Sequence, residues 1–565
     1  MKWTGRFTDY NLHSFQKDLI SGIIVGIIAI PLGMAFAIAA GVKPEYGIYT
    51  TIIAGIIISL FGGSKFQIGG PTGAFIPILF AIVLQHGYEN LLLAGLMAGI
   101  ILVLMGVFKL GVLIKFIPRP VIVGFTSGIA VIIFSGQIAN LLGLSDIPKH
   151  ENFLPNMREI IMHMDAVNLY SILIAFICLI SIFISTKLFP KIPSSLVGLL
   201  VSSIVAALFF SGQVATIGSA YGAIPSQLPQ LQMPVITMER VLTMLQPAII
   251  IALLGGIESL LSAVVADGMT GSRHNSNREL IGQGVANIVT PLFGGIPATG
   301  AIARTATNIR TGAVSPMSGI IHGVVVLLIL MLFAPYASAI PLASMAPILM
   351  IVAWNMSERK TFAHVLKTKT SDSLILVVTF LLTVFTNITI AVQVGLVLAI
   401  IIFVKRMADV MQVDKVELEE DLPHVVQSNN TNNDHISQHR VNASPTELYP
   451  DIGVYTVKGP LFFGAANMFE QSMIDLLQTE PKVLLLRMKK VPFMDTTGEY
   501  NVANLIKRVQ SYGCIVLIAG IQPQPLDVIK RTGLIKTIGE QHLFARTDDA
   551  IQYAKGKLGY NNENT

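Results

Sequence analysis

Charged residues are scarce in this chain: Asp, Glu, Lys and Arg make up 13% of its 565 residues, whereas a soluble protein carries about 25%. Hydrophobic residues make up 53%, and the mean hydropathy is +0.67. This composition excludes a single large soluble enzyme and a disordered chain, and it predicts a polytopic membrane protein. Two cysteines, Cys178 and Cys514, are too few for a disulfide scaffold.

The chain contains long runs of apolar residues. We expect no signal peptide, since the first apolar run begins near Leu19 and is long enough to span a bilayer. Three further segments are shorter and rich in Gly or Pro. The sequence therefore predicts fourteen membrane segments: 19–42, 48–62, 72–86, 88–108, 118–141, 169–187, 193–211, 245–266, 278–292, 300–311, 315–334, 339–354, 372–386 and 388–405.

Positive charge is distributed unevenly over the predicted loops. With this segment count, one side of the membrane holds 18 Lys and Arg residues and the other holds 4. Because basic residues accumulate in cytoplasmic loops, we expect both termini in the cytoplasm and the protein in the plasma (inner) membrane. The net charge of +5 then reports topology, and we expect no nucleic-acid partner.

The composition changes after the last apolar run and defines the domains. We predict a cytoplasmic N-terminus (1–18), a transmembrane transport domain (19–407), a polar flexible linker (408–447), a soluble domain (448–556) and a tail (557–565). In the soluble domain, expected strands alternate with expected helices, which indicates an α/β fold. The strands are expected at 452–457, 483–487 and 515–519, and the helices at 465–477 and 499–510.

An internal repeat indicates where a substrate binds. The stretch GGPTGA at 69–74 matches GGIPATGA at 294–301, and the first long span starts at the same offset from its counterpart near Leu245. Two halves, about 19–211 and 245–407, would each hold seven segments and so lie in opposite orientations, as in inverted-repeat transporters. Short helices starting near Thr72 and Gly300 would then face each other with their positive N-termini, which is an anion site.

Charged residues within the spans are rare, and we interpret two of them as functional. Glu258 lies in the middle of an apolar span, so it faces a cavity or is protonated, and we predict a coupling-ion site. Ser262 shares its helix face and could offer an oxygen to a cation, such as Na⁺. Arg304 falls about one turn into the second short helix and would add a full positive charge. We interpret His322, which has no recognisable partner, as structural.

Several motifs together resemble one transporter family. PEYGIYTT at 44–51, GGPTGAF at 69–75, IESLLSAVVADGMTG at 257–271 and TGAIARTATNIRTGA at 299–313 resemble the SulP anion-transporter family of sulfate permeases and anion exchangers. The C-terminal stretch with DTTG at 495–498 resembles a STAS domain. The resemblance implies a bacterial member with the seven-plus-seven inverted fold of uracil permeases, core and gate domains, a homodimer, and an anion between the third and tenth segments. The substrate-binding positions that it implies are Thr72, Gly73, Ala74, Phe75, Thr299, Gly300, Ala301, Ile302 and Arg304.

The leading hypothesis is a secondary active transporter of sulfate, bicarbonate or a C4-dicarboxylate, with H⁺-coupled symport by an elevator-like movement. The alternatives are a Na⁺-coupled bicarbonate symporter, an anion exchanger, an uncoupled anion channel and a membrane-anchored signalling protein. No Walker loop or metal-ligand cluster is present, and DTTG lacks a neighbouring base, so we expect neither an enzyme nor a cofactor. The only metal considered is Na⁺ at Glu258 and Ser262.

Overall fold

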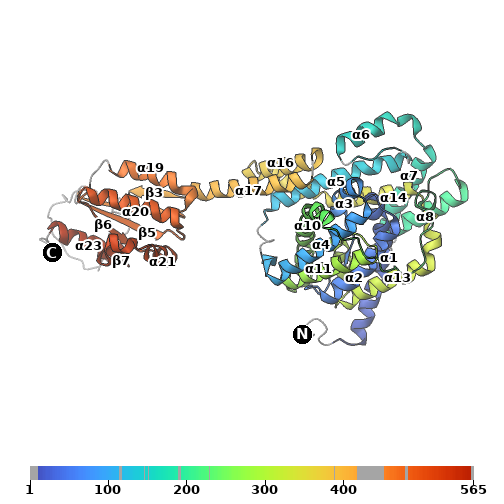
Figure 1. The fold of residues 1–565 in the computed structure, drawn as a ribbon, viewed down its shortest axis with the longest axis horizontal. Helices are drawn as coiled ribbons and strands as arrows, with labels where there is room; N and C mark the ends of the chain where they lie inside the picture. Colours follow the sequence, from blue (N-terminus) through green and yellow to red (C-terminus); the bar gives the residue numbers. More distant parts are fainter. Residues whose placement is uncertain are drawn as a thin grey trace, which may run out of the picture. The chain divides into compact units, whose positions relative to one another are not determined.

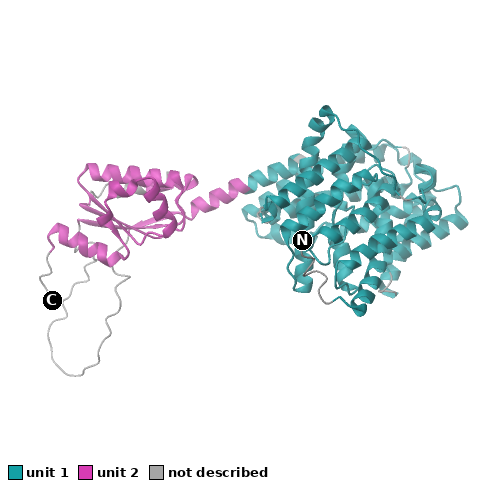
Figure 2. Ribbon diagram, turned by 60° about the horizontal axis from the view of Figure 1, so that its bottom comes forward, with its two compact units in different colours: residues 1–399 teal, residues 400–565 magenta. Residues whose placement is uncertain are grey.

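The structure is a computed structural model, in which the chain divides into two compact units, residues 1–399 and 400–565 (Figure 2). The first nine residues, most of the predicted linker and the last five residues lie outside the described part of the chain. The structure describes residues 10–112, 117–144, 147–150, 152–188, 193–227, 229–386, 388–415, 451–477 and 481–560.

A helix lies at each of the fourteen predicted membrane segments, which confirms the seven-plus-seven architecture (Figure 1). Eight of the described helices are long and apolar enough to cross a membrane. The first repeat comprises α1 (Leu12–Ala39), α2 (Pro44–Phe61), α3 (Ile76–His86), α4 (Tyr88–Val107), α5 (Arg119–Leu142), α7 (Leu169–Leu188) and α8 (Ser194–Phe209). The second comprises α10 (Met238–Thr270), α11 (Ser276–Leu292), α12 (Ile302–Arg310), α13 (Met317–Ala337), α14 (Leu342–Met356), α16 (Ser371–Phe385) and α17 (Ile388–Asp409).

Among the described residues, three α-helices between these segments were not predicted from the sequence. They are α6 (Phe153–Met162), α9 (Ile217–Tyr221) and α15 (Arg359–Lys367). The helix α15 buries none of its residues, so it lacks the apolar run by which the other segments are recognised. These helices connect membrane segments and do not alter the order of the repeats.

The helices of the first unit pack in two groups. In the core group, α4 packs on α10 and α11, α1 packs on α13, and α2 packs on both α11 and α13. The two short helices belong to the same group: α3 packs against α4, and α12 packs against α10 and α1. In the outer group, α5 packs on α14 and α16, and α7 packs on α8 and α14. The helices of each group come from both repeats, as an inverted-repeat transporter requires.

Small residues let the core helices approach closely. A Cβ atom at Gly99 of α4 would lie 2.7 Å from the Gly284 carbonyl oxygen of α11, and one at Gly284 would lie 2.6 Å from that of Gly99. Such backbone-to-backbone contact drives helix association where lipid removes the hydrophobic gain. It makes the core group a rigid support for the short helices.

The second unit contains a five-stranded sheet in the order β3-β4-β5-β6-β7. Only β3 runs antiparallel to its neighbour. The central strands β4 to β6 are apolar on both faces because helices cover both: Leu484 and Leu486 face one apolar cluster, and Val483 and Leu485 face another. The elements are β3 (Gln412–Lys415), β4 (Ile452–Lys458), α19 (Ala466–Leu477), β5 (Val483–Lys490), α20 (Thr496–Ser511), β6 (Ile515–Ala519), α21 (Pro523–Arg531), α22 (Leu534–Ile538), β7 (Leu543–Phe544) and α23 (Thr547–Leu558).

The three predicted strands and two predicted helices of this unit are confirmed. The strand β3 is a difference, because residues 412–415 fall in the predicted linker but pair with 455–458 of β4. The strand β3 lies at the edge of the sheet, and three of its four residues are exposed. It therefore lacks the apolar residues by which the other strands were predicted. The described sheet therefore begins three residues after α17 ends.

Candidate functional site

Two short strands hold the broken helices together. The strand β1 (Gly69–Gly70) pairs antiparallel with β2 (Thr299–Gly300), joining Gly69 to Gly300 and Gly70 to Thr299. The Ala301 N–H also donates to the Ile68 carbonyl at 2.8 Å. After each strand the chain turns into a short helix: a 3₁₀ turn at Gly73–Phe75 leads into α3, and Ile302 opens α12. The two predicted substrate-binding stretches therefore start side by side.

Arg304 lies buried behind this crossing, with 3% of its surface exposed. Its Nη2 donates to the carbonyl oxygen of Pro71, which directly follows β1. Its Nη1 is buried without a hydrogen-bond partner and lies where a Cβ atom of Gly70 would stand. A buried guanidinium with a free N–H donor, beside two helix N-termini, can donate a hydrogen bond to an anion.

Glu258 contributes a carboxylate to the same place. Its Oε2 accepts a hydrogen bond from the Thr72 hydroxyl at 2.9 Å, which links α10 to the residue before the 3₁₀ turn. Glu258 is partly exposed, whereas Thr72 is 6% exposed. Within the described part of the chain, no salt bridge joins Glu258 to Arg304. The carboxylate is therefore free to change its protonation or partner without breaking an ion pair.

A polar network that the sequence did not reveal fixes β2 on α10. The Ser259 hydroxyl lies 2.7 Å from the Thr299 hydroxyl and accepts from the Gly300 N–H at 3.0 Å. Gln67 donates to the Ser259 carbonyl at 3.0 Å. Ser259 directly follows Glu258 in the sequence, but the partners of its hydroxyl lie 40 or more residues away, so residue spacing does not reveal its role. It is a positioning residue of the site.

Ser262 forms a second set of polar contacts between α10 and α12. Its hydroxyl donates to the Thr305 hydroxyl at 3.3 Å, and Thr305 in turn accepts from the Ile68 N–H at 3.0 Å. Both side chains are fully buried. Ser262 thus links α10 to α12 one helical turn after Glu258. Within the described residues, no group of three or more His, Cys, Asp or Glu side chains gathers as a metal site would require.

The remaining predicted residues line the crossing where the two helix groups meet. Phe75 is 1% exposed, and its ring lies where a Cβ atom at Gly255 of α10 would come within 3.0 Å. A Cβ atom at Gly73 would face Met356 and Ile133, at the end of α14 and in α5 of the outer group. Ala74 and Ala301 are 8% and 6% exposed, and Ile302 is 38% exposed.

The extended stretch before β2 is held by side chains from α11 and α2. Asn287 donates to the Ala298 carbonyl and accepts from the Ala298 N–H, each at 2.8 Å. Thr50 donates to the Ile296 carbonyl at 3.0 Å. Non-helical backbone inside a membrane needs such partners because lipid offers none.

His322 of α13 lies nearer the crossing than its sequence suggests. It is fully buried, and both ring nitrogens lack a hydrogen-bond partner. Its Nδ1 would stand 2.9 Å from a Cβ atom at Gly55, and the Gly69 carbonyl of β1 would lie 3.7 Å from that atom. The imidazole therefore packs beside the strand that carries the site.

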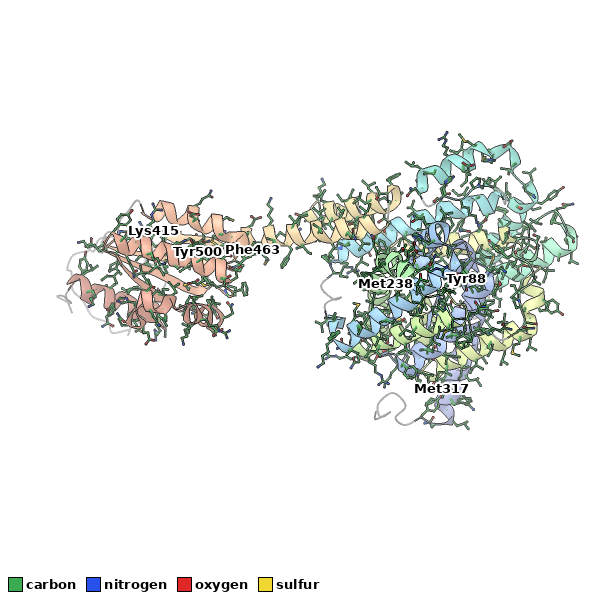
Figure 3. The ribbon with its side chains drawn as sticks, viewed as in Figure 1. Tyr88, Met238, Met317, Lys415, Phe463 and Tyr500 are labelled. Carbon is green, nitrogen blue, oxygen red and sulfur yellow. The ribbon has the colours of Figure 1, made fainter. Side chains whose placement is uncertain are left out.

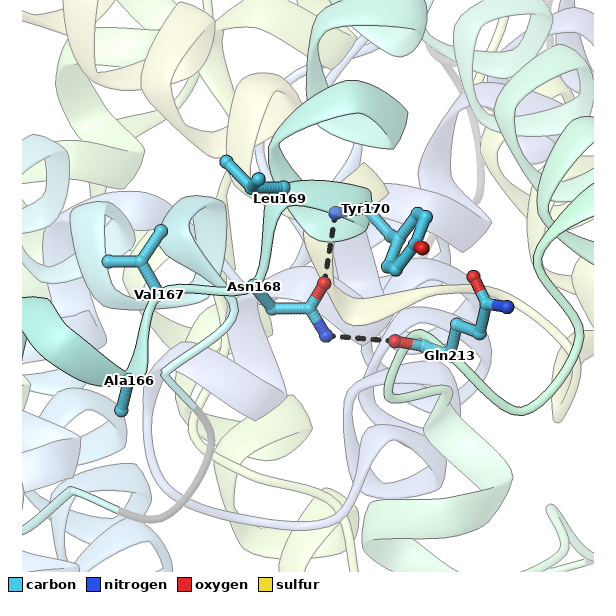
Figure 4. Close-up of a pocket in the computed structure, with 6 residues that line it drawn as sticks. All are labelled: Ala166, Val167, Asn168, Leu169, Tyr170 and Gln213. Carbon is cyan, nitrogen blue, oxygen red and sulfur yellow. Dashed lines mark hydrogen bonds between the residues drawn. The ribbon is translucent and has the colours of Figure 1, made fainter.

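A separate cavity of about 520 Å³ at the start of α7 is not part of this arrangement (Figure 4). Asn168 accepts from the Tyr170 N–H at 2.9 Å and donates to the Gln213 carbonyl at 2.8 Å. The six residues that line this cavity include no charged side chain. We interpret the Asn168 side chain as a cap for the start of α7 and do not assign the cavity to substrate binding.

The comparisons with known proteins agree with this architecture. The model of the sulfate permease family matches residues 15–379, and that of the STAS domain matches residues 444–550. The chain is 54% identical over 549 residues to the "Putative sulfate transporter YvdB" of Bacillus subtilis (strain 168), covering 97% of this chain and 99% of that one.

Two solved structures share the fold. The transmembrane domain of a cyanobacterial bicarbonate transporter, BicA, has 30% identity and a TM-score of 0.61, covering 69% of this chain and 98% of that one. The murine anion transporter Slc26a9 has 19% identity and a TM-score of 0.83, covering 97% and 92%. The chain is therefore a membrane-embedded anion transporter and not an enzyme, and it belongs to the sulfate permease (SulP) family with a C-terminal STAS domain.

Proposed function

We propose that this transporter is an H⁺-coupled symporter that binds a small inorganic or dicarboxylate anion between the N-termini of α3 and α12. The anion would lie at Thr72, Gly73, Ala74 and Phe75 on one side and at Thr299, Gly300, Ala301, Ile302 and Arg304 on the other. The observation that carries this proposal is the β1–β2 pair, which places both helix starts beside a buried, unpartnered guanidinium nitrogen.

Glu258 supplies the coupling. The Glu258 carboxyl group is hydrogen-bonded to Thr72, a residue of the proposed anion site. When it is ionised it repels an incoming anion, whereas the protonated carboxylic acid does not repel the anion and can donate a hydrogen bond to it. Anion and proton therefore favour each other's binding, and this linkage is reciprocal. Protonation requires only the carboxylate, whereas Na⁺ at Glu258 and Ser262 needs several oxygen ligands, and the Ser262 hydroxyl already bonds Thr305.

The two helix groups provide the movement. The site is built on the core group, and Gly73 faces Met356 and Ile133 of the outer group. An elevator-like displacement of the core group along the outer group would carry the bound anion across the membrane, as in other transporters that rock one bundle against another. The plasma membrane, cytoplasmic termini and a homodimer remain part of this proposal, supported by the charge asymmetry of the loops and the family resemblance.

Bicarbonate is the main alternative substrate to sulfate, because the structural relative with 30% identity is described as a bicarbonate transporter. Uptake into proteoliposomes separates the possibilities. Labelled sulfate, bicarbonate and fumarate are tested under an imposed proton gradient and then an imposed Na⁺ gradient.

We expect the proton gradient to drive accumulation of one anion, and Glu258→Gln to abolish that accumulation. Glu239→Gln, an exposed carboxylate on the same helix, is the matched control and should leave uptake unchanged. Accumulation driven only by the Na⁺ gradient would show that Na⁺, and not H⁺, is the coupling ion. Passive anion current with no accumulation under either gradient would establish the channel instead.

A further inference from the structure

An apolar groove of about 1040 Å³ lies in the second unit beside the end of α17. Three of its apolar lining side chains are strongly exposed: Phe403 at 61%, Val410 at 52% and Phe493 at 46%. Phe463, which follows the lining residue Phe462, is 62% exposed. Phe462 lies inside the groove and packs edge-on against Phe463, with ring centroids 5.3 Å apart. Figure 3 shows Phe463 at the end of the soluble unit from which α17 extends. Exposed apolar surface of this kind marks an interaction site.

The groove is fixed to the end of a membrane span. The candidate span Ile390–Asp409 lies within α17. Ala408 and Met411, 6% and 1% exposed, belong to the apolar core that includes Tyr455 and Val457 of β4. A Cβ atom at Gly459 would lie 2.8 Å from the Val410 carbonyl oxygen. The last turns of the span and the loop after β4 are therefore one packed body.

This packing determines the depth of the groove in the bilayer. Phe403 and Asp409 both line it, and six residues of α-helix rise about 9 Å. The headgroup region of a leaflet is roughly 5–8 Å thick. The groove thus reaches from the edge of the hydrocarbon to the aqueous surface, where a lipid molecule offers both an apolar and a charged part.

Two basic side chains line the groove, and two more lie nearby in sequence on α17. Lys458 and Lys490 are paired in register on β4 and β5 and both line the groove. Lys458 forms an ion pair with Asp414 at 2.7 Å, whereas Lys490 has no ion-pair partner among the described residues. Lys405 and Arg406 lie on the last turns of α17, and Asp409 is the acidic lining residue. Such basic clusters next to a span attract anionic lipid headgroups.

We propose that this groove binds an anionic phospholipid of the adjoining leaflet. Its phosphate would lie at Lys458 and Lys490, and its acyl chains against Phe403, Phe462 and Phe493. The bound lipid would then bridge the last span and the STAS domain. This site is independent of the anion site and of the coupling ion.

The apolar part is tested with a nitroxide attached at Phe493→Cys in the full chain. Cys178 and Cys514 are buried, so the introduced thiol is labelled selectively. In phosphatidylglycerol vesicles, we expect this nitroxide to collide more with oxygen than with a water-soluble nickel chelate. Tyr512→Cys, 68% exposed on the same unit, is the control and should show the reverse. An aqueous profile at both positions, or spin–spin broadening that shows a second copy in the groove, would overturn the proposal.

The charged part is tested with a photoreactive phosphatidylglycerol in nanodiscs. We expect cross-links to peptides around 403–412, 458–463 and 490–493, and competition by unlabelled phosphatidylglycerol but not by phosphatidylcholine. Lys490→Gln should weaken the competition about fivefold. Lys482→Gln, whose lysine pairs with Asp451 at 3.3 Å outside the groove, should not. Equal labelling in both variants and by a phosphatidylcholine probe would show that the groove does not select an anionic lipid, and would overturn the proposal.

Discussion

Arg304 and Glu258 place two opposite charges near one crossing without joining them in an ion pair. An unsatisfied buried donor costs about 1–3 kcal/mol, and Arg304 Nη1 is such a donor. The bond from Nη2 to the Pro71 carbonyl could serve a structural role, but it leaves the cost of the unpartnered Nη1 unrecovered. A ligand oxygen that binds Nη1 recovers that cost, which is why we assign Arg304 to substrate binding.

Gly70 provides a direct test of this assignment. It has φ +152°, and a Cβ atom there would occupy the position of Arg304 Nη1. Gly70→Ala should displace the guanidinium and lower anion uptake at least about tenfold, since a hydrogen bond to a charged group contributes roughly 1.5–3 kcal/mol. Gly268→Ala on α10, which meets open space, should be neutral. Equal uptake by both variants would contradict the role of Arg304.

Cys514 gives a prediction in the soluble unit. Burial raises the pKa of the Cys514 thiol to about 11. At pH 8 about one thiol in a thousand is then ionised, compared with roughly a quarter for an ordinary cysteine. Alkylation by N-ethylmaleimide should therefore be slow in the folded protein and rise about tenfold per pH unit up to the raised pKa. Rapid labelling of Cys514 at pH 8, measured by mass spectrometry, would contradict its burial.

At the scale of elements, the site depends on two extended segments that break the helices inside the membrane. Each break frees backbone groups, and the structure satisfies them with the β1–β2 pair and with side chains of α2, α10 and α11. The short helices therefore keep their N-termini in place before any anion arrives. Preorganisation of this kind reduces the cost of binding.

Asn287 is the strongest of these supports. Asn287→Ala leaves both the N–H and the carbonyl of Ala298 without their partner, and each buried group costs about 1–3 kcal/mol. We expect the free energy of unfolding to fall by about 2–4 kcal/mol in a denaturant titration, with loss of uptake. Asn90→Ala removes only a bond to the carbonyl of His86 one turn earlier and should have a small effect. Similar stability in the two variants would contradict the supporting role of Asn287.

Particular elements show what the sequence could and could not predict. Apolar length and Gly–Pro breaks were sufficient to predict the fourteen segments, and strand–helix alternation to predict the soluble unit. The pairing of β1 with β2 was not predictable, because two-residue strands 230 residues apart carry no periodicity. The contacts of Thr72 with Glu258, and of Ser259 with Thr299 and Gly300, depend on helix rotation, which composition does not determine.

At the scale of the whole molecule, the first unit has its own apolar core and contains every residue of the proposed anion site. A chain that ends after Arg406 should therefore still bind its anion, with an affinity within about threefold of the full chain. Binding and melting of the truncated protein can be measured in detergent. Loss of anion binding in a folded truncation would show that the STAS domain completes the site.

Proton uptake on anion binding is the most direct test of the coupling. Calorimetric titration of the purified full chain in buffers of different ionisation enthalpy gives the number of protons taken up per bound anion. We predict uptake of up to about one proton at neutral pH for the wild type, and none for Glu258→Gln with binding retained. A wild type that binds its anion without proton uptake, or an unchanged uptake in Glu258→Gln, would contradict the assignment of the coupled proton to Glu258.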